Sequence, residues 1–262
     1  MKQVAPLVNL AVSTGEPAGI GPEVSLAAAL DFLREHSNVV ITLLGDERLL
    51  SLPKNIDPAL ASRLQVESIK LKTPVVSGVL NPQNAQYVIA LLDQAINGCQ
   101  QGRFDAMVTA PLQKSIINDA GTSFTGHTEH LAQRCNISHV VMMLCAPLPA
   151  GFLGLKSPRD LRVALVTTHL PLKDVPQALS YDLILETIQI VNRDLQKKFG
   201  IANPVIRMAG LNPHAGESGY LGREEIEIIT PAIEAAKAMG IQVSGPYPGD
   251  TMFDPESIAQ VD

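Results

Sequence analysis

Apolar and polar positions along the chain follow two periods, one typical of strands and one typical of helices. Short apolar runs predict β-strands, and they fall at Leu7–Val12, Val39–Gly45, Ala106–Ala110, Val140–Leu144, Leu161–Thr167, Pro204–Gly210 and from Ile241 onward. Apolar residues three and four positions apart predict helices at about 22–35, 81–101, 112–118, 128–134, 181–199 and 223–239. Because strands and helices alternate, we expect an α/β fold built on doubly wound, largely parallel sheets.

The ends of several helices are marked by residues with a known local preference. Asn81 followed by Pro82 predicts a helix start, because Asn caps free N–H groups and Pro fits the first turn. Gly102 and Gly200 each predict a helix end, and Pro231 predicts a kink in the last helix. The segment 51–80 shows no regular pattern.

Composition narrows the class of protein. The chain has 262 residues, of which 46% are apolar and 18% charged, so it can bury a sizeable, mostly aliphatic core. The net charge of −6 is spread without a basic run, which argues against nucleic acid as a partner. No apolar stretch approaches the ~20 residues that span a bilayer, and the apolar start reads as a buried strand rather than a signal peptide. The three cysteines lack metal-type spacing, so we expect reduced thiols and a cytoplasmic protein.

Candidate chemistry repeatedly follows the predicted strands. In an open α/β sheet, ligands bind beyond the carboxyl ends of the strands, where loops converge. The features in this position are the turn Thr14–Gly21, Lys114, His169, His214 and Asp250. This convergence predicts a binding site without reference to any family.

The glycines of the turn Thr14–Gly21 match neither a dinucleotide-binding fingerprint nor a phosphate-binding P-loop. Two interpretations are open. The glycines can bring the backbone close to an anionic ligand at the start of the next helix, or they can form only a sharp strand-to-helix turn. Glu16 favours the first interpretation, because a turn alone does not need a carboxylate.

Four of the histidines invite functional hypotheses. His169 and His214 are suited to hold a divalent cation together with Asp250 or water, although a hydrogen-bonded loop histidine is common. His127 and His130 are three residues apart at a helix start, which places both imidazoles on one face. They suit a zinc pair, but substrate binding by His127 and Thr128 is equally consistent with the pattern, and Thr128 is also a candidate helix cap.

At these residues the sequence resembles the 4-hydroxythreonine-4-phosphate dehydrogenase family of vitamin B6 biosynthesis. The matching segments are TGEPAGIGPE at 14–23, NDAGTSFTGHTEH at 118–130, VALVTTHLPL at 163–172 and GLNPHAGESG at 210–219. They occur in the family's order and span most of the chain. The resemblance implies two α/β domains around a central cleft, as in isocitrate and isopropylmalate dehydrogenases. We expect these domains to be residues 1–125 and 126–262.

The resemblance also implies roles for particular residues. His127 and Thr128 are expected to bind substrate, and His169 and His214 to bind one divalent metal, either zinc, magnesium or cobalt. Asp250, Glu16 and Lys114 are weaker site candidates, His130 lies outside the family pattern, and the residues that contact the cofactor are not identified.

The implied reaction is oxidation of 4-phosphooxy-L-threonine by NAD or NADP, followed by decarboxylation to 3-amino-2-oxopropyl phosphate. The family implies a homodimer with the active site at its interface.

Two departures from the family pattern bear on these expectations. The loop at 147–158 is longer than expected. Family members also continue beyond the position of Asp262 with a Tyr-His-Asp-Gln-Gly segment, which supplies a third metal histidine, and with further substrate-binding residues. A chain that ends at Asp262 is therefore expected to lack a metal ligand and the segment that completes the first domain.

Two alternatives remain beside the main hypothesis. One is a related dehydrogenase that acts on a phosphorylated threonate or erythronate. The other is a non-catalytic fragment, because retained motifs do not prove activity.

Overall fold

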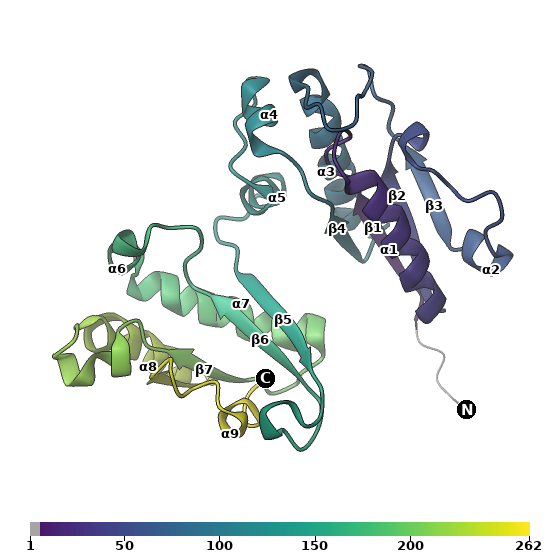
Figure 1. Ribbon diagram of the computed structural model, residues 1–262. Helices are drawn as coiled ribbons and strands as arrows, with labels where there is room; N and C mark the ends of the chain where they lie inside the picture. Colours follow the sequence, from purple (N-terminus) through teal and green to yellow (C-terminus); the bar gives the residue numbers. More distant parts are fainter. Residues whose placement is uncertain (1–5) are drawn as a thin grey trace. The chain divides into compact units, whose positions relative to one another are not determined.

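The computed structural model describes residues 6–262, which form two compact units that divide between Val140 and Val141 (Figure 1). The sequence suggested a division between residues 125 and 126. The difference is the helix α5 (His127–Cys135), which packs against α3 (Ala85–Gln100) of the first unit. His130 of α5 reinforces this packing by an ion pair to Asp93 of α3.

A four-stranded parallel sheet forms the centre of the first unit. Its strands are β1 (Val8–Ser13), β2 (Val39–Gly45), β3 (Leu64–Ser68) and β4 (Ala106–Thr109), in the order β3-β2-β1-β4. Three of them confirm the sequence prediction. The strand β3 lies in the segment that showed no regular pattern, because its residues are only partly buried at the edge of the sheet and alternate weakly.

Helices cover both faces of this sheet (Figure 1). The adjacent residues Ala11 and Val12 of β1 point to opposite faces, where they join two different clusters of buried side chains. Ala11 packs with α3, whereas Val12 packs with α1 (Gly21–Glu35). The unit is therefore doubly wound, as the alternating pattern predicted.

Shorter helices connect these elements. They are η1 (Glu47–Leu49), α2 (Pro58–Ala61), η2 (Pro82–Asn84) and α4 (Lys114–Asp119). Asn81 caps as predicted, since its side chain accepts a hydrogen bond from the Gln83 N–H. The residues that follow form the 3-10 turn η2 before the α-helix begins at Ala85, three residues later than Pro82 suggested.

The second unit contains two separate pairs of strands. The strands β5 (Met142–Leu148) and β6 (Arg159–Leu165) pair antiparallel, whereas β7 (Val205–Ala209) and β8 (Gln242–Tyr247) pair parallel. Pairing in the described residues is therefore largely parallel, as expected, with β5 and β6 as the exception. The connection at 149–158, which includes the 3-10 turn η3 (Phe152–Gly154), is shorter than the crossover that parallel neighbours require, so the chain reverses direction.

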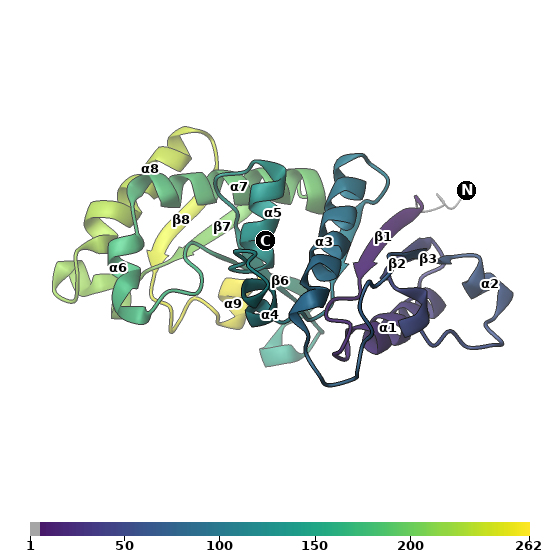
Figure 2. The ribbon, with the colours of Figure 1, turned by 90° about the horizontal axis from the view of Figure 1, so that it is seen from above.

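Two helices supply much of the core of the second unit. They are α7 (Tyr181–Phe199), which ends at Gly200 as predicted, and α8 (Thr230–Ala238), which packs against α7 and β8 (Figure 2). A π-helical turn, η6 (Glu225–Ile229), precedes α8 directly and so lies just before Pro231, where the sequence indicated an irregularity. The remaining elements are η4 (Leu172–Asp174), α6 (Val175–Ala178), η5 (Pro213–Gly219) and α9 (Pro255–Ile258).

The structure confirms the α/β class. In the range 6–262, no helix combines the length and the apolar character that a membrane span requires.

Candidate functional site

The turn between β1 and α1 is shaped by close contacts within the first unit. Gly15 has a φ of +71°, and a Cβ on it would lie 2.3 Å from the Pro111 carbonyl oxygen. A Cβ on Gly21 would lie 2.1 Å from the Thr14 carbonyl oxygen. These approaches explain both glycines without a ligand, and they favour the interpretation of a sharp turn over that of an anion-binding loop.

Glu16 lies inside this turn rather than on its surface. Its side chain is buried, and one carboxyl oxygen accepts a hydrogen bond of 3.1 Å from the Ala18 N–H. Its backbone N–H donates to the Pro111 carbonyl at 3.0 Å. Burial raises the pKa of the Glu16 carboxyl, while the Ala18 N–H opposes that rise. The carboxyl thus stabilises the turn.

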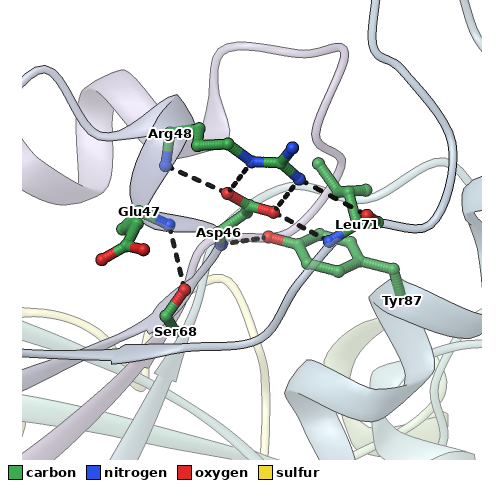
Figure 3. Close-up of polar contacts among 6 residues, drawn as sticks. All are labelled: Asp46, Glu47, Arg48, Ser68, Leu71 and Tyr87. Atoms are coloured by element: carbon green, nitrogen blue, oxygen red, sulfur yellow. Dashed lines mark hydrogen bonds and ion pairs between the residues drawn. The ribbon is translucent and has the colours of Figure 1, made fainter.

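A buried carboxylate that the sequence analysis missed lies at the end of β2 (Figure 3). Asp46 accepts hydrogen bonds from the Arg48 guanidinium at 2.8 and 2.6 Å, from the Arg48 backbone N–H at 3.0 Å, and from the Leu71 N–H at 2.8 Å. The bonds from Arg48 hold the pKa of Asp46 far below its usual range. An aspartate directly after a strand, followed two residues later by arginine, is the sequence signal for such a turn.

Tyr87 connects this carboxylate turn to the glycine-containing turn. Its hydroxyl accepts a hydrogen bond of 2.8 Å from the Asp46 backbone N–H (Figure 3). The same hydroxyl also contacts the Thr14 side chain. The Thr14 hydroxyl donates to the Leu44 carbonyl at 3.0 Å. In the same region the Glu47 N–H donates to Ser68 at 3.4 Å. The carboxyl ends of β1, β2 and β3 are therefore held by one polar network.

Three of the expected site residues lie at or beside the start of α5: His127 and Thr128 in the helix itself and Lys114 from α4. The helix is capped by Gly126 without a side-chain hydrogen bond, so the expectation that Thr128 caps it is wrong. Thr128 is the second helical residue and is exposed. A Cβ on Gly126 would lie 3.3 Å from the Lys114 Nζ atom, which places this ammonium group beside the first turn. The free N–H groups and Lys114 attract negative charge, and a Glu129 carboxyl oxygen, 2.6 Å from the same Cβ position, already supplies some of it.

His127, the first residue of α5, carries a buried ring nitrogen without a hydrogen-bond partner. Its Nε2 atom is buried and has no hydrogen-bond partner, and its ring packs edge-on against Phe124 at 6.3 Å between centroids. Burial lowers the pKa of His127, and the positive charge of Lys114 and the ring of His130 lower it further. Protonation of this imidazole is therefore disfavoured, and its buried Nε2 atom lacks a hydrogen-bond partner.

His130 has a structural role. Its Nε2 atom lies 2.9 Å from an Asp93 carboxyl oxygen, and Arg134 binds the same oxygen at 3.0 Å. Because this nitrogen already has a partner, the structure does not support a zinc pair of His127 and His130.

In the second unit, His214 and Asp250 lie near each other. His214 Nδ1 is 3.9 Å from an Asp250 carboxyl oxygen, and both side chains are exposed. His169 follows β6, has a φ of +55° and is exposed. Residues of β6 and β7, together with those directly after each strand, line one cavity of about 340 Å³.

The loop that carries His214 has an unusual backbone. Five consecutive residues have a left-handed conformation, with φ between 43° and 80°: His214, Ala215, Gly216, Glu217 and Ser218. This conformation costs roughly 1–2 kcal/mol for each residue other than glycine. The loop therefore needs contacts outside itself to hold it.

Glu225 provides such contacts, and the sequence analysis did not single it out. Its carboxylate is buried and accepts hydrogen bonds from the Asn212 backbone N–H at 2.7 Å and from the Asn212 side-chain amide at 3.0 Å. The pKa of Glu225 is lowered overall: burial opposes ionisation, but the hydrogen bonds from Asn212 and neighbouring N–H groups outweigh it.

The donor types suit some metals better than others. Imidazole nitrogens with a carboxylate suit zinc or cobalt, whereas magnesium prefers oxygen ligands. The structure brings His214 and Asp250 together, but nowhere between residues 6 and 262 does it gather three such groups. The residues present fit part of a metal site.

Comparison with known proteins places the chain in one family. A family model described as pyridoxal phosphate biosynthetic protein PdxA matches residues 26–262. The 4-hydroxythreonine-4-phosphate dehydrogenase of Ralstonia nicotianae is 49% identical over 273 residues, covering 98% of this chain and 79% of the relative. The enzyme of the same name from Burkholderia vietnamiensis is 49% identical over 263 residues, covering 98% and 77%.

A solved structure agrees with this assignment. The crystal structure of 4-hydroxythreonine-4-phosphate dehydrogenase from Klebsiella pneumoniae matches with a TM-score of 0.79 at 28% identity, covering 97% of this chain and 78% of that one. This likeness confirms the expected fold related to isocitrate and isopropylmalate dehydrogenases. On the family model, the sequence identity and the fold together, the chain belongs to the pyridoxal phosphate biosynthetic protein PdxA family of dehydrogenases.

Proposed function

We propose that this oxidoreductase converts 4-phosphooxy-L-threonine to 3-amino-2-oxopropyl phosphate. The carbon that bears the substrate hydroxyl loses a hydride to NAD⁺ or NADP⁺, the hydroxyl loses a proton, and the resulting ketone then loses carbon dioxide. The observation that carries this proposal is the 49% identity, over 98% of the chain, to a relative named for this substrate.

The first unit is proposed to bind the substrate through His127 and Thr128. The neutral, unpartnered Nε2 atom of His127 needs a polar partner, and a substrate oxygen or N–H group would supply one. The exposed Thr128 hydroxyl and the free N–H groups of the first turn of α5 would orient the same molecule. Lys114, beside this turn, would favour the phosphate or carboxylate of the substrate.

The second unit is proposed to hold a divalent metal through His169 and His214, with Asp250 as a further candidate ligand. The proximity of His214 and Asp250 supports this assignment, and the donor set favours zinc or cobalt over magnesium. When bound, such a cation supplies Lewis-acid stabilisation of the negative charge on the substrate oxygen. His169 and His214 must be neutral to bind it, so metal affinity should fall in acid.

The remaining expectations are also proposals. We infer a homodimer from the resemblance to the family, and a cytoplasmic location from the sequence composition and its cysteines. The three cysteines, Cys99, Cys135 and Cys145, are free thiols, which is consistent with a reducing compartment.

The test is formation of NADH or NADPH from 4-phosphooxy-L-threonine by the purified protein, with zinc, cobalt or magnesium added and then removed by a chelator. We expect metal-dependent turnover that His169→Ala and His214→Ala abolish. His36→Ala is the matched control, because His36 is exposed at the end of α1 and is not a site candidate.

Two other results would change the assignment. Faster turnover of a phosphorylated threonate or erythronate would support the related dehydrogenase instead. Absence of turnover with every metal and both cofactors would contradict the proposal for this chain.

A further inference from the structure

We propose that Glu225 is the positioning residue that holds the His214 loop in its left-handed form, so that His214 is presented for metal binding. The effect on metal binding rests on the proposed role of His214 as a metal ligand. The structural part, that Glu225 holds the loop, depends only on the contacts within the second unit.

The contacts join the carboxylate to the residue where the loop begins. Both Glu225 oxygens accept hydrogen bonds from Asn212, one from its backbone N–H at 2.7 Å and one from its side-chain amide at 3.0 Å. The Asn212 amide also donates to Glu224 at 2.8 Å. Asn212 is therefore fixed by its main chain and its side chain, two residues before His214.

The shape of the loop is matched to this carboxylate. A Cβ on Gly216 would lie 2.7 Å from one Glu225 oxygen, and a Cβ on Gly210 would lie 3.1 Å from the other. The two glycines therefore let the loop close tightly around the carboxylate. Gly216 has a φ of +80° and lies in the middle of the left-handed run. The same glycine therefore permits both the close approach of Glu225 and the left-handed backbone.

Hydrogen bonds within the loop close it in this conformation. The Ala215 N–H donates to the Asn212 carbonyl at 3.1 Å, and the Leu221 N–H donates to the Gly216 carbonyl at 3.1 Å. Fixing Asn212 therefore fixes the first of these bonds directly. Glu225 itself is held at the start of the π-helical turn η6, a rare conformation often found at functional sites.

Both carboxyl oxygens of Glu225 accept hydrogen bonds from Asn212. The change Glu225→Gln keeps the size of the side chain, but it replaces one acceptor oxygen with an NH₂ donor that faces a donor of Asn212. Glu227→Gln is the matched control, because Glu227 lies in the same π-helical turn but is exposed and pairs with Arg223.

The experiment measures two properties of each full-length variant. The first is hydrogen exchange of the Ala215 and Leu221 amides without metal, and the second is affinity for cobalt by calorimetry. We expect Glu225→Gln to lower protection of these amides about tenfold. It should also weaken cobalt binding by about 10- to 100-fold, the effect usual for residues that orient a ligand. Glu227→Gln should match the wild type in both.

Two results would overturn the inference: wild-type amide protection in Glu225→Gln, or lost protection with unchanged cobalt affinity. His214→Ala separates this failure from that of the proposed function. If His214→Ala leaves cobalt binding unchanged, the metal role of His214 is wrong, whereas the exchange data still decide whether Glu225 holds the loop. Should Glu225→Gln fail to fold, Glu225→Asp keeps the charge but shortens the side chain, so that it no longer reaches Asn212 as well. Unchanged protection of the Ala215 and Leu221 amides in that variant would contradict the inference.

Discussion

Three buried carboxyl groups differ in what surrounds them, and their pKa values differ accordingly. Asp46 and Glu225 each accept several hydrogen bonds, and their pKa values are lowered. Glu16 is comparably buried, but its carboxyl accepts only one hydrogen bond in the structure, from the Ala18 backbone N–H, and its pKa is raised. Hydrogen bonding to the charged form outweighs burial in the first two groups and not in the third.

Asp46→Asn is predicted to destabilise the protein by about 2–3 kcal/mol near neutral pH, because it removes charge-assisted hydrogen bonds to a buried group. The folded-state pKa of Asp46 lies below the unfolded value of about 3.9. Its contribution is therefore complete above roughly pH 5 and is lost as the pH falls through the folded-state pKa. Urea unfolding at several pH values should show the difference between wild type and variant shrinking in acid. Asp31→Asn, at an exposed ion pair with Arg34, is the control and should change little.

Lys114→Gln is predicted to raise the pKa of His127. The ammonium group is one of the causes that lower this pKa, so its removal makes protonation easier, while burial still holds the value below normal. An NMR titration of the His127 ring would measure the shift. Lys70→Gln, at an exposed lysine of the same unit, should leave the titration unchanged, and an equal shift in that control would contradict the assigned cause.

At the scale of elements, local signals were sufficient where a helix or strand has a strong period and clear ends. The helix α7 has the predicted bounds, because Ser180 caps its start and Gly200 takes the left-handed conformation at its end. The turn between β1 and α1 is different. Its glycines were visible in the sequence, but the atoms that require them, on Pro111 and Thr14, come from the folded unit.

Gly15→Ala is predicted to destabilise the first unit more than Gly78→Ala. Both glycines have a positive φ, so each change costs about 1 kcal/mol for the left-handed backbone. Only at Gly15 would the new Cβ also meet a backbone oxygen, at 2.3 Å, whereas nothing lies within 4 Å at Gly78. Comparison of the two urea midpoints isolates the cost of the close contact. Equal midpoints would show that the turn relaxes freely.

At the scale of the whole molecule, the clusters of buried side chains belong to one unit or the other. Leu91 lies in a cluster with residues of β1, β2 and α3, whereas Ile233 lies in a cluster with residues of α7, α8 and β8. Both side chains are fully buried. Stability therefore has to be considered for each unit rather than as a single two-state quantity.

Leu91→Ala and Ile233→Ala are each predicted to destabilise the surrounding unit by about 2–5 kcal/mol, the usual cost of a large-to-small change in a core. Hydrogen exchange read by peptide should show the greatest loss of protection in α3, β1 and β2 for the first variant. For the second variant, the greatest loss should fall in α7, α8 and β8. The exposed residue Leu172 offers a control, since Leu172→Ala should cost little.

The sequence by itself determined the α/β class and most strand and helix positions, because these depend on local periodicity. Its distinctive motifs also singled out His127, Thr128, His169 and His214 as the proposed site residues. Tertiary structure alone decided the antiparallel pairing of β5 with β6, the burial of Glu16 and the unsatisfied nitrogen of His127. It also revealed Asp46 and Glu225, whose partners at Leu71, Tyr87 and Asn212 lie 13 or more residues away. Single charged residues leave no periodic signal, so only the folded chain shows which donors surround them.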